Sequence, residues 1–363
     1  MENKWSNEAF KGEVEVPSGF QGKVAWSSPS NIALVKYWGK RGKQIPQNPS
    51  ISFTLSECRS ETFVTYEKAD SFGFRFFFEG KENPAFGAKI EKFLLDYQTF
   101  FPFINQLSLT VESYNTFPHS SGIASSASSM SAFVMCLMEI ENLLVGPSTG
   151  SGTLDLCKAS YFARLASGSA ARSVFPKMAL WGKTDCYKGS SDEFAVSLEN
   201  DIHPVFKTYR DAILIVSGET KSVSSRAGHA LMEGNPYAPA RYALANENIK
   251  NLLAALKSGD LDTFINITES EALQLHALMM CSNPSYILMK PNTLNLINEI
   301  RGFREETKIP LCFTLDAGPN VHLLYPEQEA DKVEYHIKNV LADYCDQERW
   351  IADHVGDGLK KLL

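Results

Sequence analysis

The segment from Pro118 to Ser128 constrains the fold of this chain most strongly, because it joins a predicted strand to a long predicted helix. It reads Pro-His-Ser-Ser-Gly-Ile-Ala-Ser-Ser-Ala-Ser, and β-rich sequence over residues 107–112 precedes it. A helix is predicted over residues 122–144. That helix is indicated by an apolar stripe at helical spacing, made of Ile123, Ala127, Met130, Val134 and Leu137.

A loop of this kind can direct backbone N–H groups, hydroxyls and a helix N-terminus onto one polyphosphate. An ordinary serine N-cap is the alternative, but it does not require the unbroken run of small residues from Ala124 to Ser129. The established nucleotide motifs are absent. Lys177 occupies the first glycine position of a Walker A loop that would end at Thr184, and no Gly-x-Gly-x-x-Gly follows a strand.

Length, charge and cysteine usage narrow the class of protein. A chain of 363 residues suggests about two domains. The net charge of −7 argues against general binding to nucleic acid or anionic membranes. The seven cysteines form no Cys-x-x-Cys pair, which favours reduced thiols and a cytoplasmic location. We expect no signal peptide in residues 1–22 and no membrane-spanning helix.

Strands and helices are grouped rather than regularly alternating, which predicts an α+β fold. We place the domain boundary within residues 200–209, giving domains 1–205 and 206–363. Strands are predicted over residues 23–30, 31–37, 50–55, 61–67, 72–79, 107–115, 178–181, 193–198, 211–217, 311–315 and 321–325. Helices are predicted over residues 84–100, 122–144, 154–165, 168–175, 222–233, 238–257, 261–280, 292–306 and 327–341.

Two segments place a single cation among apolar or small residues. Lys36 lies in an otherwise apolar predicted strand, where a buried ammonium is costly without an anionic partner. The alternative is a solvated basic edge strand. Arg172 follows the run Ala-Ser-Gly-Ser-Ala-Ala that begins at Ala166, and it could hold a carboxylate or phosphate with two parallel hydrogen bonds. A helix cap with a surface arginine is the alternative there.

A third segment, from Thr314 to Asn320, places Asp316 at the end of an apolar strand and before a Gly-Pro-Asn turn. A simple Asx-turn is one interpretation. The other is a carboxylate held by rigid backbone beside a phosphate site, acting as a base or as a positioning group.

Together these motifs resemble the diphosphomevalonate decarboxylases of the GHMP kinase superfamily, from about Lys23 to about Tyr325. The matching motifs are Asn31-Ile32-Ala33, Lys36 to Arg41, Gly122 to Ala127, Ser167 to Ala170, Arg172-Ser173 and Phe313 to Asn320. The resemblance implies a two-domain α+β fold. Its N-terminal domain would be a ribosomal-protein-S5-like β/α unit carrying the phosphate loop, its C-terminal domain an α/β sandwich, and its active site the cleft between them.

The resemblance also implies the activity: ATP and Mg²⁺ are used to phosphorylate the 3-hydroxyl of mevalonate 5-diphosphate, and loss of phosphate and CO2 gives isopentenyl diphosphate. It implies a homodimer as well. Mevalonate 5-phosphate as the substrate, or a small-molecule kinase without decarboxylation, are the alternatives. The kinase alternative is disfavoured because Lys36, Arg172 and Asp316 occur together.

Residue roles follow from the same match. The expected catalytic residues are Asp316, Lys36 and Arg172, with Asp316 either removing the hydroxyl proton or positioning the hydroxyl. The expected substrate-binding residues are Asn31, Tyr37, Lys40, Ser167, Ser169 and Arg172. The expected ATP- and magnesium-binding residues are Ser113, Asn115, Ser121, Gly122, Ala124, Ser125 and Ser126, with Ser125 and Ser126 as the metal ligands. The loop starts Pro-His-Ser-Ser at Pro118 instead of the family's Pro-Thr-Ala-Ala, a difference expected to affect nucleotide affinity.

Overall fold

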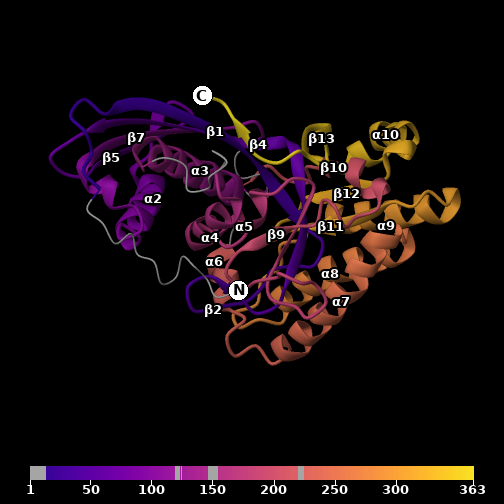
Figure 1. Cartoon of the computed structure of the whole chain (residues 1–363). Coiled ribbons are helices and arrows are strands. Elements are labelled where there is room, and N and C mark those ends of the chain that lie inside the picture. The colour runs from indigo at the N-terminus through magenta and orange to yellow at the C-terminus, as the bar shows by residue number, and fades with distance from the viewer. Residues whose placement is uncertain (1–13, 119–122, 124, 146–153, 220–224) are drawn as a thin grey trace.

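The computed structural model describes residues 14–118, 123, 125–145, 154–219 and 225–363. Their strands form an eight-stranded sheet, a four-stranded sheet and a two-stranded ribbon. Elements that are close in sequence mostly lie in the same half of the molecule. Figure 1 shows the large sheet with α2 to α5 in indigo and magenta on one side, and the small sheet with α7 to α10 in orange and yellow on the other.

Two long neighbouring strands, β1 (Gln21–Ala33) and β4 (Ser50–Lys68), form the centre of the large sheet. They pair antiparallel, with a register shift between Pro29 and Asn31. The strand order is β14-β1-β4-β7-β5-β6, and β8 and β9 extend from β4. The other strands are β5 (Gly73–Phe78), β6 (Lys81–Glu82), β7 (Leu107–Asn115), β8 (Met178–Trp181), β9 (Ala195–Ser197) and β14 (Lys360–Lys361). The separate ribbon pairs β2 (Lys40–Arg41) with β3 (Ile45–Pro46).

Helix α3 (Ser125–Val145) covers this sheet by packing against β1 and β4. It is long and apolar enough to cross a membrane, but 72% of that stretch is buried inside the protein, as expected for a core helix. Helices α4 and α5 pack against α3 in turn. The remaining helices of this half are α2 (Pro84–Asp96), α4 (Leu156–Ala166) and α5 (Ala170–Ser173).

The small sheet is antiparallel throughout, in the order β11-β12-β10-β13. Helix α8 packs on β11, and α7 packs on α8. The strands are β10 (Arg210–Leu214), β11 (Cys312–Leu315), β12 (Val321–Tyr325) and β13 (Trp350–His354). The helices are α6 (Ser225–Ala230), α7 (Ala238–Ser258), α8 (Leu261–Met280), α9 (Pro291–Thr307) and α10 (Ala330–Asn339).

An apolar core shared by both halves fixes their relative position. Phe53 of β4 packs against Tyr209 and Phe264, with ring centroids 5.8 and 6.0 Å away. Asp353 of β13 adds a polar attachment, because its carboxylate accepts the backbone N–H groups of residues 56, 57 and 58 of β4 at 2.8, 2.9 and 2.8 Å. Strand β4 is therefore anchored in both halves.

The α+β class is confirmed, but several predicted strands are wrong in detail. Residues 23–30 and 31–37 do not form two strands, since β1 ends at Ala33 and the chain then leaves the sheet. Residues 50–55 and 61–67 belong to the single strand β4. Strands β2, β3, β6, β13 and β14 were not predicted. The boundary between domains 1–205 and 206–363 stays a prediction; β9 ends at Ser197 and β10 begins at Arg210.

Candidate active site

A buried ion pair connects the two halves of the molecule. Lys36 follows β1 and is 2% exposed, and Asp316 follows β11. The Lys36 Nζ lies 3.3 Å from the Asp316 Oδ1. About a quarter of the Asp316 side chain is exposed, whereas the Lys36 side chain is almost completely buried.

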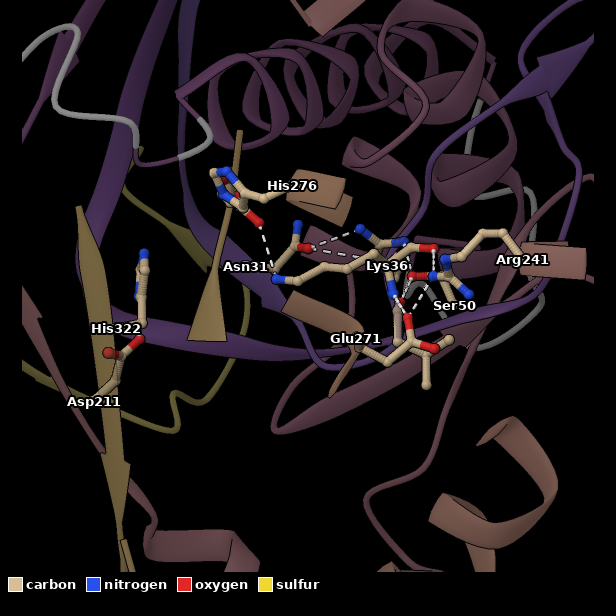
Figure 2. A network of polar contacts seen from close by, with 11 residues as sticks. Asn31, Lys36, Ser50, Asp211, Arg241, Glu271, His276 and His322 are labelled. Carbon is tan, nitrogen blue, oxygen red and sulfur yellow. Dashed lines mark hydrogen bonds and ion pairs between the residues drawn. The ribbon is translucent and has the colours of Figure 1, made fainter. Parts of the chain in front are cut away.

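The backbone of Lys36 is held by side chains rather than by a neighbouring strand. Its N–H donates to Glu271 of α8 at 2.9 Å, and its carbonyl accepts from Asn48 at 3.1 Å. Glu271 is fully buried and also accepts from Arg241 and Asn248 of α7. Figure 2 shows Lys36, Arg241 and Glu271 gathered in this network. Helices of the second half thus position the lysine supplied by the first.

The turn that carries Asp316 is fixed on several sides. His276 of α8 donates to the Asp316 carbonyl at 3.1 Å, and the Gly318 N–H donates to the same oxygen at 2.7 Å. Thr293 of α9 donates to the Pro319 carbonyl at 2.7 Å. Asn320 accepts the backbone N–H of Ser217 at 3.0 Å. This bonding restricts the carboxylate to a narrow range of positions.

Arg172 of α5 is held beside this pair and is 2% exposed. Its Nη1 donates to the Ser50 hydroxyl at 2.7 Å, and its Nε and Nη2 both lie 3.3 Å from the Asn31 Oδ1. Asn31 is fixed in turn by donating to the Ser173 hydroxyl at 2.8 Å. The guanidinium also stacks over the Trp181 ring, 5.8 Å from its centroid. Asn31 thus contacts Arg172 directly, and its predicted role in orienting the arginine stays a prediction.

The electrostatics of this cluster favour an incoming anion. Burial lowers the pKa of Lys36, and the Asp316 carboxylate opposes that shift. Burial lowers the pKa of Arg172 to about 10, so the guanidinium stays charged at neutral pH. Within the described part of the chain, the hydrogen-bond partners of Arg172 are Asn31 and Ser50 and no carboxylate hydrogen-bonds it, although the charge of Asp316 opposes the lowering of its pKa. A buried, hydrogen-bonded cation without a carboxylate is suited to binding one from a ligand.

The predicted substrate-binding residues lie next to this cluster. Gly168 separates Ser167 from Ser169, and a Cβ at Gly168 would lie 2.8 Å from the Tyr37 hydroxyl. The tyrosine therefore reaches the backbone between the two serines. Both serines are partly exposed. Lys40 begins β2, where its Nζ donates to Gln44 at 3.0 Å.

The predicted nucleotide residues are brought together only in part. Asn115 ends β7 and accepts the Ser60 hydroxyl at 2.7 Å, and that hydroxyl also lies 2.7 Å from the Ser128 Oγ in the first turn of α3. Ser113 lies two residues earlier on β7, and its buried hydroxyl has no partner among the described residues. Ser125 is partly buried and Ser126 is exposed at the start of α3. The remaining predicted members, Ser121, Gly122 and Ala124, lie outside the described residues.

Several residues that hold this site together carry no recognisable motif in the sequence. Glu271, Arg241 and His276 come from α7 and α8, and only the presence of charged residues on apolar helix faces could have indicated them. Asp211 and His322 form another buried pair, 2.8 Å apart. Figure 2 shows that pair to one side of the Lys36 network.

Family models match both halves of the chain. The diphosphomevalonate decarboxylase-like N-terminal domain matches residues 28–194, and the mevalonate 5-diphosphate decarboxylase C-terminal domain matches residues 212–359. The diphosphomevalonate decarboxylase of Ganoderma lucidum is 30% identical over 336 residues, which cover 87% of this chain and 79% of the relative.

The chain belongs to the diphosphomevalonate decarboxylase family.

Solved structures of this family share its fold. The mevalonate diphosphate decarboxylase of Staphylococcus aureus has a TM-score of 0.79 at 25% identity, covering 95% of this chain and 99% of that one. A complex of MDDEF with MVAPP, AMPPCP and magnesium has a TM-score of 0.78 at 26% identity, covering 94% and 99%. The predicted GHMP kinase-like two-domain fold is therefore confirmed.

Proposed function

We propose that this chain is an ATP-dependent decarboxylase that converts mevalonate 5-diphosphate to isopentenyl diphosphate, releasing ADP, phosphate and CO2. Its membership of the diphosphomevalonate decarboxylase family supports this activity. The observation that carries the proposal is the arrangement of Lys36, Arg172 and Asp316: one partly exposed carboxylate beside two buried cations.

The first chemical step transfers the γ-phosphoryl group of ATP to the tertiary 3-hydroxyl. In our proposal Asp316 accepts the hydrogen bond of that hydroxyl and receives its proton as the phosphoryl group arrives. Lys36 lies 3.3 Å from the same carboxylate and stabilises the charge on the transferring group. Both transfers, of the proton to Asp316 and of the phosphoryl group to the hydroxyl oxygen, therefore take place at the boundary between the two halves.

The second step breaks two bonds and forms a double bond. The C3–O bond breaks with departure of phosphate, the electrons of the C1–C2 bond form the alkene between C2 and C3, and C1 leaves as CO2. Arg172 holds the substrate carboxylate until that bond breaks, because it is charged, oriented by Asn31 and Ser50, and lacks a carboxylate partner among the described residues. Holding the carboxylate aligned with the leaving group is the main contribution of this arginine.

Magnesium fits the residues at the start of α3. Mg²⁺ prefers oxygen ligands and is commonly bound through substrate phosphates with few protein groups. The described residues contain no cluster of three or more His, Cys, Asp or Glu side chains that could hold a metal, so the ion would depend on ATP and on the hydroxyls of Ser125 and Ser126. The Ser113 hydroxyl and the Asn115 Nδ2, which have no partner among the described residues, supply further polar groups for the nucleotide. When bound, magnesium neutralises phosphate charge during transfer.

A substrate comparison tests the proposal. Purified protein is supplied with ATP and Mg²⁺ and either mevalonate 5-diphosphate or mevalonate 5-phosphate, and ADP, phosphate and CO2 are quantified. We expect the three products in equal amounts from the diphosphate. Formation of ADP without CO2 would show that the protein is a kinase that does not decarboxylate its product. Turnover of the monophosphate alone would identify the substrate as mevalonate 5-phosphate.

We also propose that the protein is a cytoplasmic homodimer. All seven cysteines are free, which supports a reducing compartment. The dimer rests on family resemblance alone. Light scattering after gel filtration should give twice the chain mass of 40.3 kDa, and cell fractionation should recover the protein in the soluble cytoplasmic fraction. A monomeric mass or recovery from another compartment would overturn the respective proposal.

A further inference from the structure

His229 of α6 is packed between two aromatic side chains of the opposite half. Its ring centroid lies 4.4 Å from that of Tyr37 and 4.7 Å from that of Trp38. The preceding residue, Gly228, permits this approach, because a Cβ there would lie 2.5 Å from the Trp38 ring. The position of the histidine is therefore determined closely by its neighbours.

One hydrogen bond fixes the tautomer of this ring. The backbone N–H of Gly39 donates to the His229 Nδ1 at 3.0 Å, so Nδ1 must carry a lone pair. Burial lowers the pKa of His229 to about 3, and the charges of Lys40 and Arg172 act in the same direction. The neutral ring consequently carries its hydrogen on Nε2. Among the described residues, the hydrogen bond of the His229 ring is the one to Nδ1, and none involves that Nε2–H.

The surroundings of His229 indicate what the Nε2–H meets. Tyr37, which lies against the ring, places its hydroxyl over Gly168 between the two predicted substrate-binding serines. That hydroxyl is buried and has no partner among the described residues. As far as the chain is described, two neutral donors thus lie without acceptors beside Lys40 and Arg172. Phosphate oxygens are the acceptors that suit such a mixture of donors and cations.

We infer that His229 donates its Nε2–H to the 5-diphosphate group of the substrate, completing from the second half a pocket whose other residues come from the first. This inference rests on the proposed function. It makes His229 a substrate-binding residue that helps to select the phosphorylated end of the substrate. It also gives a role to the backbone donor on Nδ1, because that bond leaves Nε2 as the only N–H of the ring.

Three substitutions separate binding from packing. His229→Gln retains an N–H near the Nε2 position, His229→Asn retains an acceptor for the Gly39 N–H but is too short to place an N–H at the Nε2 position, and His229→Phe retains only the ring. Loss of a hydrogen bond to a charged group corresponds to a change of roughly ten-fold or more. We expect His229→Asn and His229→Phe to raise the KM for mevalonate 5-diphosphate about ten-fold, and His229→Gln to stay within about three-fold. The KM for ATP and kcat should change little in all three.

His336 provides a matched control, because it also stacks on an aromatic ring, with its centroid 3.9 Å from that of Phe303. His336→Asn should leave both KM values unchanged. An unchanged KM for the diphosphate in His229→Asn would overturn the inference. So would an equal rise in His229→Gln and His229→Asn. If the wild-type protein itself fails to turn over mevalonate 5-diphosphate, the proposed function fails instead.

A measurement on the unmodified side chain covers the case in which the variants do not fold. Nitrogen-15 NMR of histidine-labelled wild-type protein should show the Nε2–H tautomer of His229 before ligand is added. Adding mevalonate 5-diphosphate without ATP should shift the Nε2 resonance at saturation. A resonance that does not respond to saturating diphosphate would contradict the inference, whatever the kinetics of the variants.

Discussion

Asp316 combines properties that a catalytic carboxylate requires. It is fixed through its backbone by His276, remains partly exposed, and lies 3.3 Å from the buried ammonium of Lys36. Each property has a separate cause: the helix α8 fixes the turn, the strand end provides access, and the chain after β1 supplies the cation. No single sequence motif contains all of them.

Asp316→Asn tests this residue directly. The amide has nearly the same shape but cannot take a proton, and it removes the negative charge beside Lys36. We expect kcat to fall by about 10³-fold, within the range typical of a lost general base. Affinity for a non-hydrolysable ATP analogue, measured by calorimetry, should stay within about three-fold. Activity within ten-fold of wild type would defeat the proposed role of Asp316.

The buried position of His229 should also affect the stability of the protein in acid. Its pKa is lowered from 6.5 to about 3 in the folded state, so the unfolded chain binds the extra proton first as pH falls. Its contribution to stability is therefore present above pH 6.5 and is lost progressively as pH falls toward 3. The melting temperature of His229→Gln should fall less steeply than that of wild type across this range. Parallel melting curves would show that His229 does not titrate as described.

At the scale of elements, the helices bounded by local signals were predicted best. Helix α8 matches its predicted bounds, because Asp260 caps its N-terminus by accepting the Thr263 N–H at 3.0 Å. Gly259 ends α7 in the left-handed conformation, with φ of 83°. Such caps involve neighbouring residues and can be recognised without the rest of the fold.

Strand errors arose where bonding partners are distant in sequence. Residues 56–58 interrupt the apolar pattern of β4, but their N–H groups are satisfied by Asp353, almost 300 residues away. Lys36 leaves the strand pattern for the same reason, since Glu271 accepts its N–H. The motifs therefore identified the charged residues of the site, while the groups that position them depended on contacts that periodicity does not reveal.

Glu271 tests whether α7 and α8 position Lys36. Glu271→Gln leaves Arg241 buried without its charged partner, and removing one member of a buried pair typically costs about 3 to 5 kcal/mol. We expect urea unfolding to show that the free energy of unfolding falls by an amount near the lower end of this range. We also expect kcat to fall, because Lys36 shifts from its position. Combining Glu271→Gln with Arg241→Met should recover part of the stability. Strictly additive losses would show that the two residues are not coupled.

At the scale of the whole molecule, the site depends on two halves being held in one relative position. Asp353 contributes to this by accepting three consecutive N–H groups of β4. Asp353→Ala should lower the free energy of unfolding by about 3 kcal/mol, since it leaves buried donors unsatisfied. The exposed Asp343→Ala serves as the control and should have little effect. Equal stability of the two variants in urea would remove Asp353 from this role.

The central claim is that both halves act together to turn the 3-hydroxyl of the substrate into a phosphate leaving group. Labelling that hydroxyl with oxygen-18 and analysing the released phosphate by mass spectrometry tests it most directly. If the hydroxyl is phosphorylated before CO2 is lost, each released phosphate carries the label. Unlabelled phosphate, with the oxygen-18 recovered in water, would contradict the mechanism.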